Sequence, residues 1–367
     1  MVPMSKANSL EKAILNYLDG VAVSEDIQRL HLCGAGAVCE LEEKLKRHHR
    51  MKYAVCVSNA TTGLLAVALA LNLKQSDFIT TPLTFGASIA GWLLLGNRPI
   101  FADIEPETLT LDPAAVQHAI TPKTRAILVS DIFGNPHDMV SMRKIADDHG
   151  LCYIADAAQS LGATRDNLPS SSLADALVIS FTAGKTVFAG EGGAVLTNNS
   201  DLYQKLIWFT QHTGRQKKEL GLNVTNELAL NARIHPMAAL WANAVFLESL
   251  KALKSYQSEC FAIIDLLNSI GLTEKIAFKE HNIAPSFFRL TAAWRAKPKP
   301  SKLIEELRYN GFSARLETLP VRLLYRQPAF IAQYQKNVKV VYNCPQAEKQ
   351  IRKRFCLTKT AKERFIR

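Results

Sequence analysis

Short apolar runs alternate with helical patterns from about residue 52 onward, and this alternation constrains the fold more than any other feature. The apolar runs have the length of buried strands and lie at 53–57, 77–81, 99–103, 126–131, 152–156, 176–181 and 193–197. Helical patterns separate them at 62–73, 86–95, 112–120 and 139–149. Alternation of this kind is typical of parallel sheets covered on both faces. We therefore expect an α/β fold with a mainly parallel, seven-stranded sheet between helices.

The remainder of the chain predicts a second, smaller unit. A long helical pattern runs from Pro236 to about residue 269, and the segments 287–294 and 301–311 look like a strand and a helix. We expect an N-terminal arm and large domain over 1–244 and a small C-terminal α+β domain over 245–367.

The composition indicates a globular protein, with 48% hydrophobic and 21% charged residues among 367. No apolar run reaches membrane-spanning length, and the N-terminus lacks the apolar core and cleavage site of a signal peptide. The seven cysteines are widely spaced without a C-x-x-C pair, which argues against disulfides and a zinc site. We expect a cytoplasmic protein without a metal or a membrane partner.

Positive charge gathers near the C-terminus, where residues 295–367 hold 18 Lys and Arg against 5 Asp and Glu. Such a region can bind nucleic acid, an anionic membrane surface or an acidic substrate, or it can form a solvated basic face. It has few interleaved aromatic residues and no nucleic-acid-binding motif, so we expect no nucleic-acid partner.

One lysine stands in an unusual context within "SFTAGKTVFAGEGGAV" (180–195). Lys185 lies between an apolar strand and a glycine-rich turn, where a solvated lysine is not expected. Asp156 ends an earlier apolar strand, and ligands of such sheets bind at the carboxyl ends of strands. An amine in a dry pocket and an anion for the pyridine nitrogen are what pyridoxal phosphate (PLP) needs. The alternatives are a helix N-cap for Asp156 and a solvated side chain for Lys185.

A third element of the pattern is "SNATTG" (58–63), which follows one strand and opens a helix. Thr61, Thr62 and Gly63 would offer backbone N–H groups and hydroxyls at the helix N-terminus, where phosphate binds well. An ordinary Ser/Thr-rich helix cap explains this segment equally well by itself. A phosphate seat, a ring partner and a lysine in this order favour PLP.

These motifs resemble the DegT/DnrJ/EryC1/StrS family of PLP-dependent sugar aminotransferases, which have fold type I. The resemblance is continuous over about residues 36–240. It is carried by "YAVCVSNATTGLLAVALAL" (53–71), the block that contains "LTF" (83–85), "FGNPHDM" (133–139), "YIADAAQSLGA" (153–163), the lysine segment with "GEGG", and "NARIHPMAAL" (231–240). Weaker matches lie at 323–330 and 343–348.

The resemblance implies a role for each matching residue. Lys185 would bind the cofactor's aldehyde and act as acid and base, and Asp156 would keep the pyridine nitrogen protonated. Phe85 would lie against the ring and Gln159 near its hydroxyl group. The implied ligands of the cofactor phosphate are Ala60, Thr61, Thr62 and Ser180, together with Asn231 from the partner subunit of a homodimer that shares its active sites. A helix cap is the alternative role for Asn231.

Several positions depart from the family pattern. The phosphate segment reads Asn59-Ala60-Thr61 where the family has Ser-Gly-Thr, and His235 and Pro236 replace a Ser/Thr and an acidic residue. The segments before Cys33 and over 212–230 are also unlike the family. Most of these departures fall where an acceptor would bind, so PLP binding is expected and the acceptor is left open.

The sequence therefore predicts an aminotransferase that moves an amino group from an amino acid, with glutamate expected, to a nucleotide-linked keto sugar. A cyclitol or another biosynthetic ketone is an alternative acceptor. A PLP-dependent sugar dehydratase is disfavoured, because the relatives with that activity have histidine at the position of Lys185. A non-catalytic regulator that keeps the fold is the alternative outside the enzymes.

Overall fold

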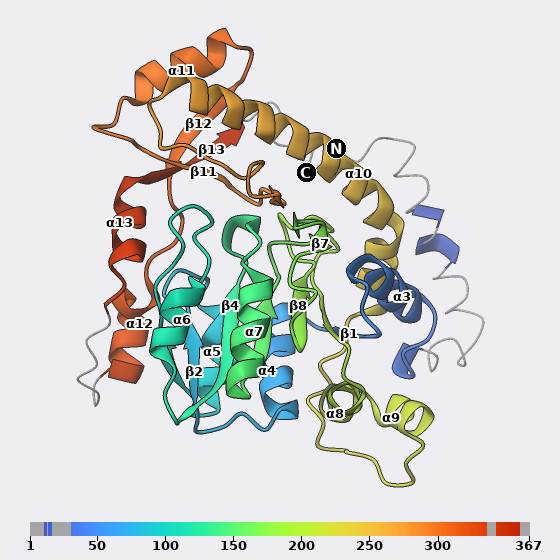
Figure 1. Ribbon diagram of the computed structural model, residues 1–367. Helices are drawn as coiled ribbons and strands as arrows, with labels where there is room; N and C mark the ends of the chain where they lie inside the picture. Colours follow the sequence, from blue (N-terminus) through green and yellow to red (C-terminus); the bar gives the residue numbers. More distant parts are fainter. Residues whose placement is uncertain (1–10, 13, 17–30, 336–342, 360–367) are drawn as a thin grey trace.

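The computed structural model describes residues 11–12, 14–16, 31–335 and 343–359. A seven-stranded sheet forms its centre, in the order β1-β9-β8-β5-β4-β2-β3 (Figure 1). The strands are β1 (Tyr53–Val57), β9 (Gly193–Thr197), β8 (Ala176–Ser180), β5 (Cys152–Asp156), β4 (Thr124–Ser130), β2 (Asp77–Thr80) and β3 (Arg98–Phe101). Only β9 among these strands runs against its neighbours. The predicted α/β fold with a mainly parallel sheet is confirmed.

Helices cover both faces of this sheet, because each strand interior is apolar on both sides. Residues of α3 (Ala37–His49), α6 (Pro113–Ala119) and α7 (Met139–His149) join the core on one face. Residues of α4 (Ala60–Ala70), α5 (Ala87–Leu94) and α8 (Ser200–Thr210) join the core on the other. Helix α9 (Thr213–Leu220) follows α8. The sheet is thus the middle layer of three.

Side-chain caps fix where several helices begin, as their sequences suggest. The side chains of Asn59, Asp112, Asp138 and Asn199 each accept a hydrogen bond from a backbone N–H in the first turn of α4, α6, α7 and α8. Pro113 fills the first turn of α6, where its missing N–H costs nothing. These local signals place the helix starts directly after the strands that precede them.

A second unit follows the long helix α10 (Pro236–Ile270). Its three-stranded antiparallel sheet has the order β11-β13-β12, with β11 (Leu290–Ala293), β13 (Arg354–Lys359) and β12 (Ala314–Thr318). Helix α11 (Pro300–Tyr309) and the last turns of α10 pack on this sheet in a separate core. The small α+β unit lies over the carboxyl ends of the main strands (Figure 1).

Several connections tie the two units together. β10 (Ile283–Ala284) pairs with β6 (Thr164–Arg165), which pairs with β7 (Leu168–Pro169). The C-terminal segment returns to the main core through Leu324, Phe330 and Cys344. Its remaining elements are η2 (Leu324–Arg326), α12 (Pro328–Phe330), the π-helix η3 (Ile331–Gln335) and α13 (Pro345–Lys353), while η1 (Ile132–Gly134) follows β4.

The expected boundary after residue 244 falls inside α10, which is one continuous helix. Ala239, Ala242 and Phe246 pack in the core of the main sheet, whereas Cys260 and Leu267 pack in the core of the second unit. The helix is therefore shared by both units, and a division at this residue stays a prediction.

Candidate functional site

The carboxyl ends of four strands meet along one edge of the main sheet. Asp156 at the end of β5 pairs with Ser130 at the end of β4. Val57 and Ser180, at the ends of β1 and β8, both pair with Gly193 at the start of β9. The residues that the sequence placed at strand ends are thus brought to a common edge, as expected for a sheet of this kind.

The carboxylate of Asp156 is oriented by two donors. Ser88 Oγ donates to Oδ2 over 2.5 Å, and the backbone N–H of Ala158 donates to Oδ1 over 3.0 Å. Burial raises the pKa of Asp156 above its usual value, although these hydrogen bonds and the charge of Lys185 act in the opposite direction. The segment after β5 consists of turns, so the alternative role of Asp156 as a helix N-cap is wrong.

Lys185 lies in a partly buried position on the turn that follows β8. Its Nζ lies over the ring of Phe288, 4.5 Å from the ring centroid. Burial lowers the pKa of Lys185, the charge of Asp156 raises it, and the charge of Arg289 lowers it further. A partly buried lysine with a lowered pKa is typical of a reactive amine rather than of a solvated side chain.

The expected phosphate seat forms the N-terminus of α4, with a change in the role of one residue. Asn59 Oδ1 accepts from both the backbone N–H and the hydroxyl of Thr62, over 2.8 and 2.9 Å. Thr62 therefore donates to the residue that caps α4, which agrees with the alternative interpretation of this segment as an ordinary helix cap. The N–H groups of Ala60 and Thr61 lie in the first helical turn, where no intrahelical acceptor exists.

Gly193 explains why the glycine-rich turn follows the lysine. A Cβ at this position would lie 2.8 Å from the backbone N of Ala60 and 2.9 Å from the carbonyl carbon of Asn59. Only glycine allows the start of β9 to approach the start of α4 this closely. The contact joins the lysine turn to the phosphate segment, and Ser180 is paired with the same glycine. Ser180 Oγ itself is 3.1 Å from Thr182 Oγ1.

Gln159 and Phe85 lie on two other segments of this edge. Gln159 Oε1 accepts from the backbone N–H of Phe133 over 2.7 Å, which fixes its amide on the segment after β4. Phe85 precedes α5 by two residues, and 67% of its surface is exposed. An exposed aromatic ring three residues before Ser88 is compatible with the predicted contact to a cofactor ring, and that role stays a prediction.

Asn231 is exposed on the segment that leads to α10. Its Oδ1 accepts from Arg233 Nη1 over 2.6 Å, and the adjacent Ala232 accepts through its carbonyl from the N–H of Ser58 over 2.9 Å. The segment therefore runs beside the phosphate segment of its own subunit. The cap of α10 is His235, whose Nδ1 accepts from the N–H of Met237, so the alternative role of Asn231 as that cap is wrong.

Sequence reasoning missed three residues that belong to the same edge: Ser88, Phe288 and Arg289. Ser88 is the second residue of α5, three positions after Phe85. The sequence pattern predicts only a strand for the segment 287–294, which contains Phe288 and Arg289. The hydroxyl and the cation were visible in the sequence, but their approach to Asp156 and Lys185 is a tertiary contact that has no local signal.

The residues present fit PLP. Asp156 is a carboxylate with a raised pKa, and a pyridinium nitrogen would lower it through the opposite charge. The first N–H groups of α4 are suited to a phosphate, and they lie against Gly193, the strand partner of Ser180. Lys185 supplies the amine. Among the described residues, no group of three or more His, Cys, Asp or Glu side chains is arranged to hold a metal ion.

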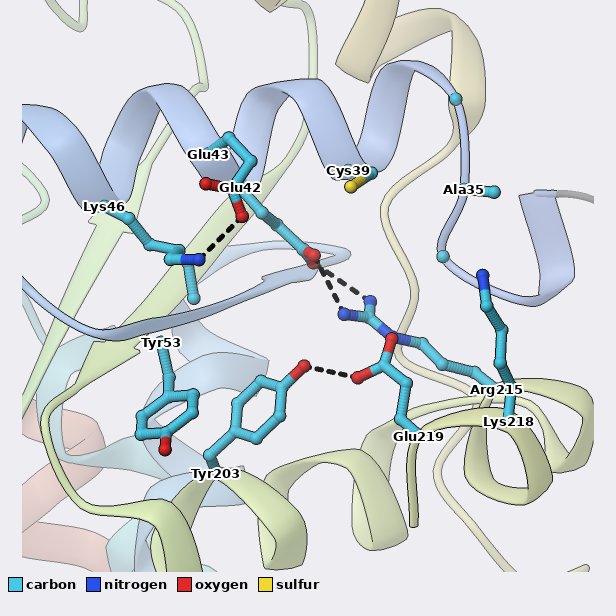
Figure 2. Close-up of a pocket in the computed structure, with 13 residues that line it drawn as sticks. Ala35, Cys39, Glu42, Glu43, Lys46, Tyr53, Tyr203, Arg215, Lys218 and Glu219 are labelled. Carbon is cyan, nitrogen blue, oxygen red and sulfur yellow. Dashed lines mark hydrogen bonds and ion pairs between the residues drawn. The ribbon is translucent and has the colours of Figure 1, made fainter. Parts of the chain in front are cut away.

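A cavity of about 230 Å³ lies at the other edge of the sheet, beside the amino end of β1 (Figure 2). Most of its charged side chains pair with one another. Arg215 donates to Glu42 over 2.8 and 2.9 Å and to Glu219 over 2.8 Å, and Tyr203 also donates to Glu219 (Figure 2). None of the predicted site residues lines this cavity, and the Arg215–Glu42 ion pair joins α9 to α3.

Comparisons with known proteins agree with this geometry. The sequence model of the DegT/DnrJ/EryC1/StrS aminotransferase family matches residues 21–362. A UDP-2-acetamido-2-deoxy-3-oxo-D-glucuronate aminotransferase of Pseudomonas aeruginosa is 33% identical over 204 residues, which are 55% of each chain. A GDP-perosamine synthase of Escherichia coli O157:H7 is 27% identical over 81% of this chain and 80% of that protein. The match to the first relative thus spans about half of its length.

Two solved structures show the same fold. Helicobacter pylori PseC, an aminotransferase involved in the biosynthesis of pseudoaminic acid, superimposes with a TM-score of 0.75 at 23% identity, over 95% of this chain and 90% of that one. An E. coli GDP-4-keto-6-deoxy-D-mannose-3-dehydratase with bound hydrated PLP superimposes with a TM-score of 0.75 at 19% identity, over 95% of this chain and 92% of that one.

No helix in the described part of the chain is long and apolar enough to cross a membrane.

Proposed function

The chain belongs to the DegT/DnrJ/EryC1/StrS aminotransferase family, and we propose that it is a PLP-dependent aminotransferase. It would move an amino group from an amino acid, with glutamate as the expected donor, to the keto group of a nucleotide-linked sugar. The observation that carries the proposal is the placement of Lys185 and Asp156 on one edge of the sheet, where the charge of each acts on the pKa of the other.

PLP, when bound, supplies an aldehyde for the amino group and a ring that takes up electrons from the donor carbon. Asp156 would hold the proton on the pyridine nitrogen, with its carboxylate kept in place by Ser88 and Ala158. Ala60, Thr61 and Ser180 would hold the phosphate, and Thr62 would support them through its bonds to Asn59. Phe85 would pack on the ring and Gln159 would face its hydroxyl group.

Lys185 is suited to proton transfer as well as to binding the aldehyde. A general base works best when its pKa lies near the working pH, and burial moves the pKa of this amine in that direction. Lys185 Nζ would move the proton between the donor Cα and the carbon of the cofactor's aldehyde group. The lysine also argues against a dehydratase, which in this family has histidine at the same position.

The acceptor class rests on the relatives. The P. aeruginosa relative carries a nucleotide keto sugar in its name, and the E. coli O157:H7 relative is named for a GDP-linked amino sugar. A cyclitol or another biosynthetic ketone stays the alternative acceptor. The cysteines suit a reducing cytosol, which is the proposed location.

We also propose a homodimer that shares its active sites. Asn231 is exposed beside the phosphate segment, so a two-fold axis near this surface would bring it to the partner's phosphate site and the partner's copy to this one. An amide donor suits a phosphate that has more acceptors than one subunit fills.

Absorbance of the purified protein tests the proposed function. The lysine–cofactor band should be present and should bleach when glutamate is added, and a screen of keto sugars should restore it. A band that persists with every amino donor would favour the non-catalytic regulator. A protein without any such band would contradict the proposal.

A further inference from the structure

Two cations share one aromatic ring beside the proposed catalytic lysine. Lys185 Nζ is 4.5 Å from the centroid of the Phe288 ring, and the guanidinium carbon of Arg289 is 5.0 Å from the same centroid. Each contact is a cation–π interaction, which an aromatic ring can provide to a cation on its face. Arg289 is therefore part of the surroundings of Lys185 although it comes from the second unit of the chain.

The position of this pair is fixed by the main sheet. The backbone N–H groups of Ser286 and Arg289 donate to the carbonyl groups of Gly134 and Phe133 over 3.0 and 3.1 Å. Ser286 Oγ also donates to the carbonyl of Gln159 over 2.6 Å. The segment thus lies against the loops that follow β4 and β5. Its side chains are held at the carboxyl edge and do not depend on the small sheet alone for their placement.

Arg289 has no acidic partner among the described residues. The only hydrogen bond that its guanidinium donates there goes from Nη1 to the carbonyl of Phe288, over 3.1 Å. Arg215 is a contrast, because two carboxylates hold it. The half-buried guanidinium of Arg289 repels the charge of Lys185 and has lost part of its hydration. A bound anion would offset the repulsion and replace the lost hydration.

We propose that Arg289 binds a carboxylate of the amino donor. The inference rests on the proposed aminotransferase function and deepens it. An amino acid carries its α-carboxylate one bond from the carbon whose proton Lys185 takes, so a cation close to Lys185 can reach it. The phosphates of a nucleotide sugar are separated from the keto carbon by part of the sugar ring. The planar guanidinium also matches a carboxylate with two parallel hydrogen bonds.

The test compares Arg289→Gln with Arg295→Gln in the PLP-loaded protein. Arg289 and Arg295 flank opposite ends of β11, and Arg295 is exposed, so it is a matched control. We expect Arg289→Gln to raise the KM for glutamate roughly 10- to 100-fold, the range for a lost hydrogen bond to a charged group. Arg295→Gln should leave the KM unchanged. Calorimetry should show the same loss for glutarate, which carries carboxylates but no amine.

A second variant keeps the test valid if Arg289→Gln folds poorly. Arg289→Lys keeps the charge but loses the paired hydrogen bonds, so its affinity for glutarate should lie between those of the wild type and Arg289→Gln. Arg289→Gln should also raise the pKa of the Lys185 amine in the PLP-free protein, because the arginine's charge lowers that pKa.

The outcomes separate this inference from the proposed function. If glutamate bleaches the wild-type band but Arg289→Gln and Arg289→Lys bind glutamate and glutarate as the wild type does, the inference is wrong. It is also wrong if only the affinity for the keto acceptor falls, because the anion then belongs to that substrate. If glutamate does not act on the wild type at all, the proposed function fails first.

Discussion

Ser88 Oγ lies 2.5 Å from Asp156 Oδ2, across 68 residues of sequence. The serine is one of a row of hydroxyl groups. Thr84 Oγ1 lies 2.9 Å from Ser88 Oγ and donates to Ser130 Oγ over 2.9 Å. All three hydroxyl residues are buried. The row connects β4 to the carboxylate at the end of β5 and fixes the direction in which that carboxylate faces.

Removal of this hydroxyl should weaken the cofactor site without removing the carboxylate. Ser88→Ala leaves Asp156 Oδ2 without its donor, so the pKa of Asp156 should rise further. We expect PLP affinity to fall about 10-fold, the size of a lost hydrogen bond to a charged group. Equilibrium dialysis with PLP measures it, and Ser88→Thr is the control that keeps the hydroxyl. Equal affinities for Ser88→Ala and the wild type would show that Ser88 does not support the site.

Substitution of Asp156 should separate stability from activity. Asp156→Asn keeps the shape but cannot hold the pyridine nitrogen protonated, so the rate should fall at least about 100-fold, or roughly 3 kcal/mol of barrier. The folded protein binds the Asp156 proton more tightly than the unfolded chain does, because the folded pKa is raised. The ionised carboxylate therefore lowers stability at neutral pH, and this cost disappears as the pH falls below about 4.

The PLP-free Asp156→Asn protein should then unfold at a higher temperature than the PLP-free wild type at pH 7, with the difference lost below about pH 4. Thermal unfolding followed by circular dichroism at both pH values checks this. Near-normal turnover by Asp156→Asn would remove Asp156 from its proposed role, whatever the unfolding temperatures are.

Gly193 should tolerate no side chain. In Gly193→Ala the new Cβ would meet the backbone of Ile179, Asn59 and Ala60, so β9 must move away from the start of α4 and from β8, and PLP should bind more weakly. Gly150→Ala is the control, because Gly150 has φ 62° but nothing within 4 Å of its Cβ position. That control should lose about 1 kcal/mol of stability and bind PLP normally. Wild-type PLP affinity in Gly193→Ala would mean that this contact does not shape the phosphate site.

Subunit mixing tests whether Asn231 acts across a dimer interface. Asn231→Asp should weaken PLP binding, because a carboxylate repels the phosphate. In a mixed dimer with Lys185→Ala, one site would collect both changes and the other neither. Random exchange should then restore roughly a quarter of wild-type activity. If the subunits exchange and the mixture stays inactive, Asn231 serves the site of its own subunit, beside Ser58.

The sequence predicted the parts of this site that depend on local pattern. Buried parallel strands are continuously apolar, so Asp156 and Ser180 could be placed at strand ends, and the apolar flanks of Lys185 indicated burial. The helix start after Asn59 was visible too. The pattern could not show that Asn59 Oδ1 accepts from both the N–H and the hydroxyl of Thr62, because a bound phosphate is an equally suitable acceptor for these two groups.

Contacts between distant segments were beyond the sequence. Arg289 and Phe288 reach Lys185 only because three hydrogen bonds hold their segment on the loops after β4 and β5. The return of Leu324 and Phe330 to the main core likewise follows from packing that no local period records. The helix that crosses the expected domain boundary continues because both of its halves are buried, each in a different core.

Chemical trapping of the lysine is the most direct test of the account. The PLP-loaded protein is reduced with borohydride, digested and mapped, with and without prior addition of glutamate. The account predicts a pyridoxyl group on Lys185 in the absence of glutamate, its loss after glutamate, and no reducible adduct in a folded Lys185→Ala variant. A pyridoxyl group on another lysine, or a Lys185 adduct that glutamate does not diminish, would contradict it.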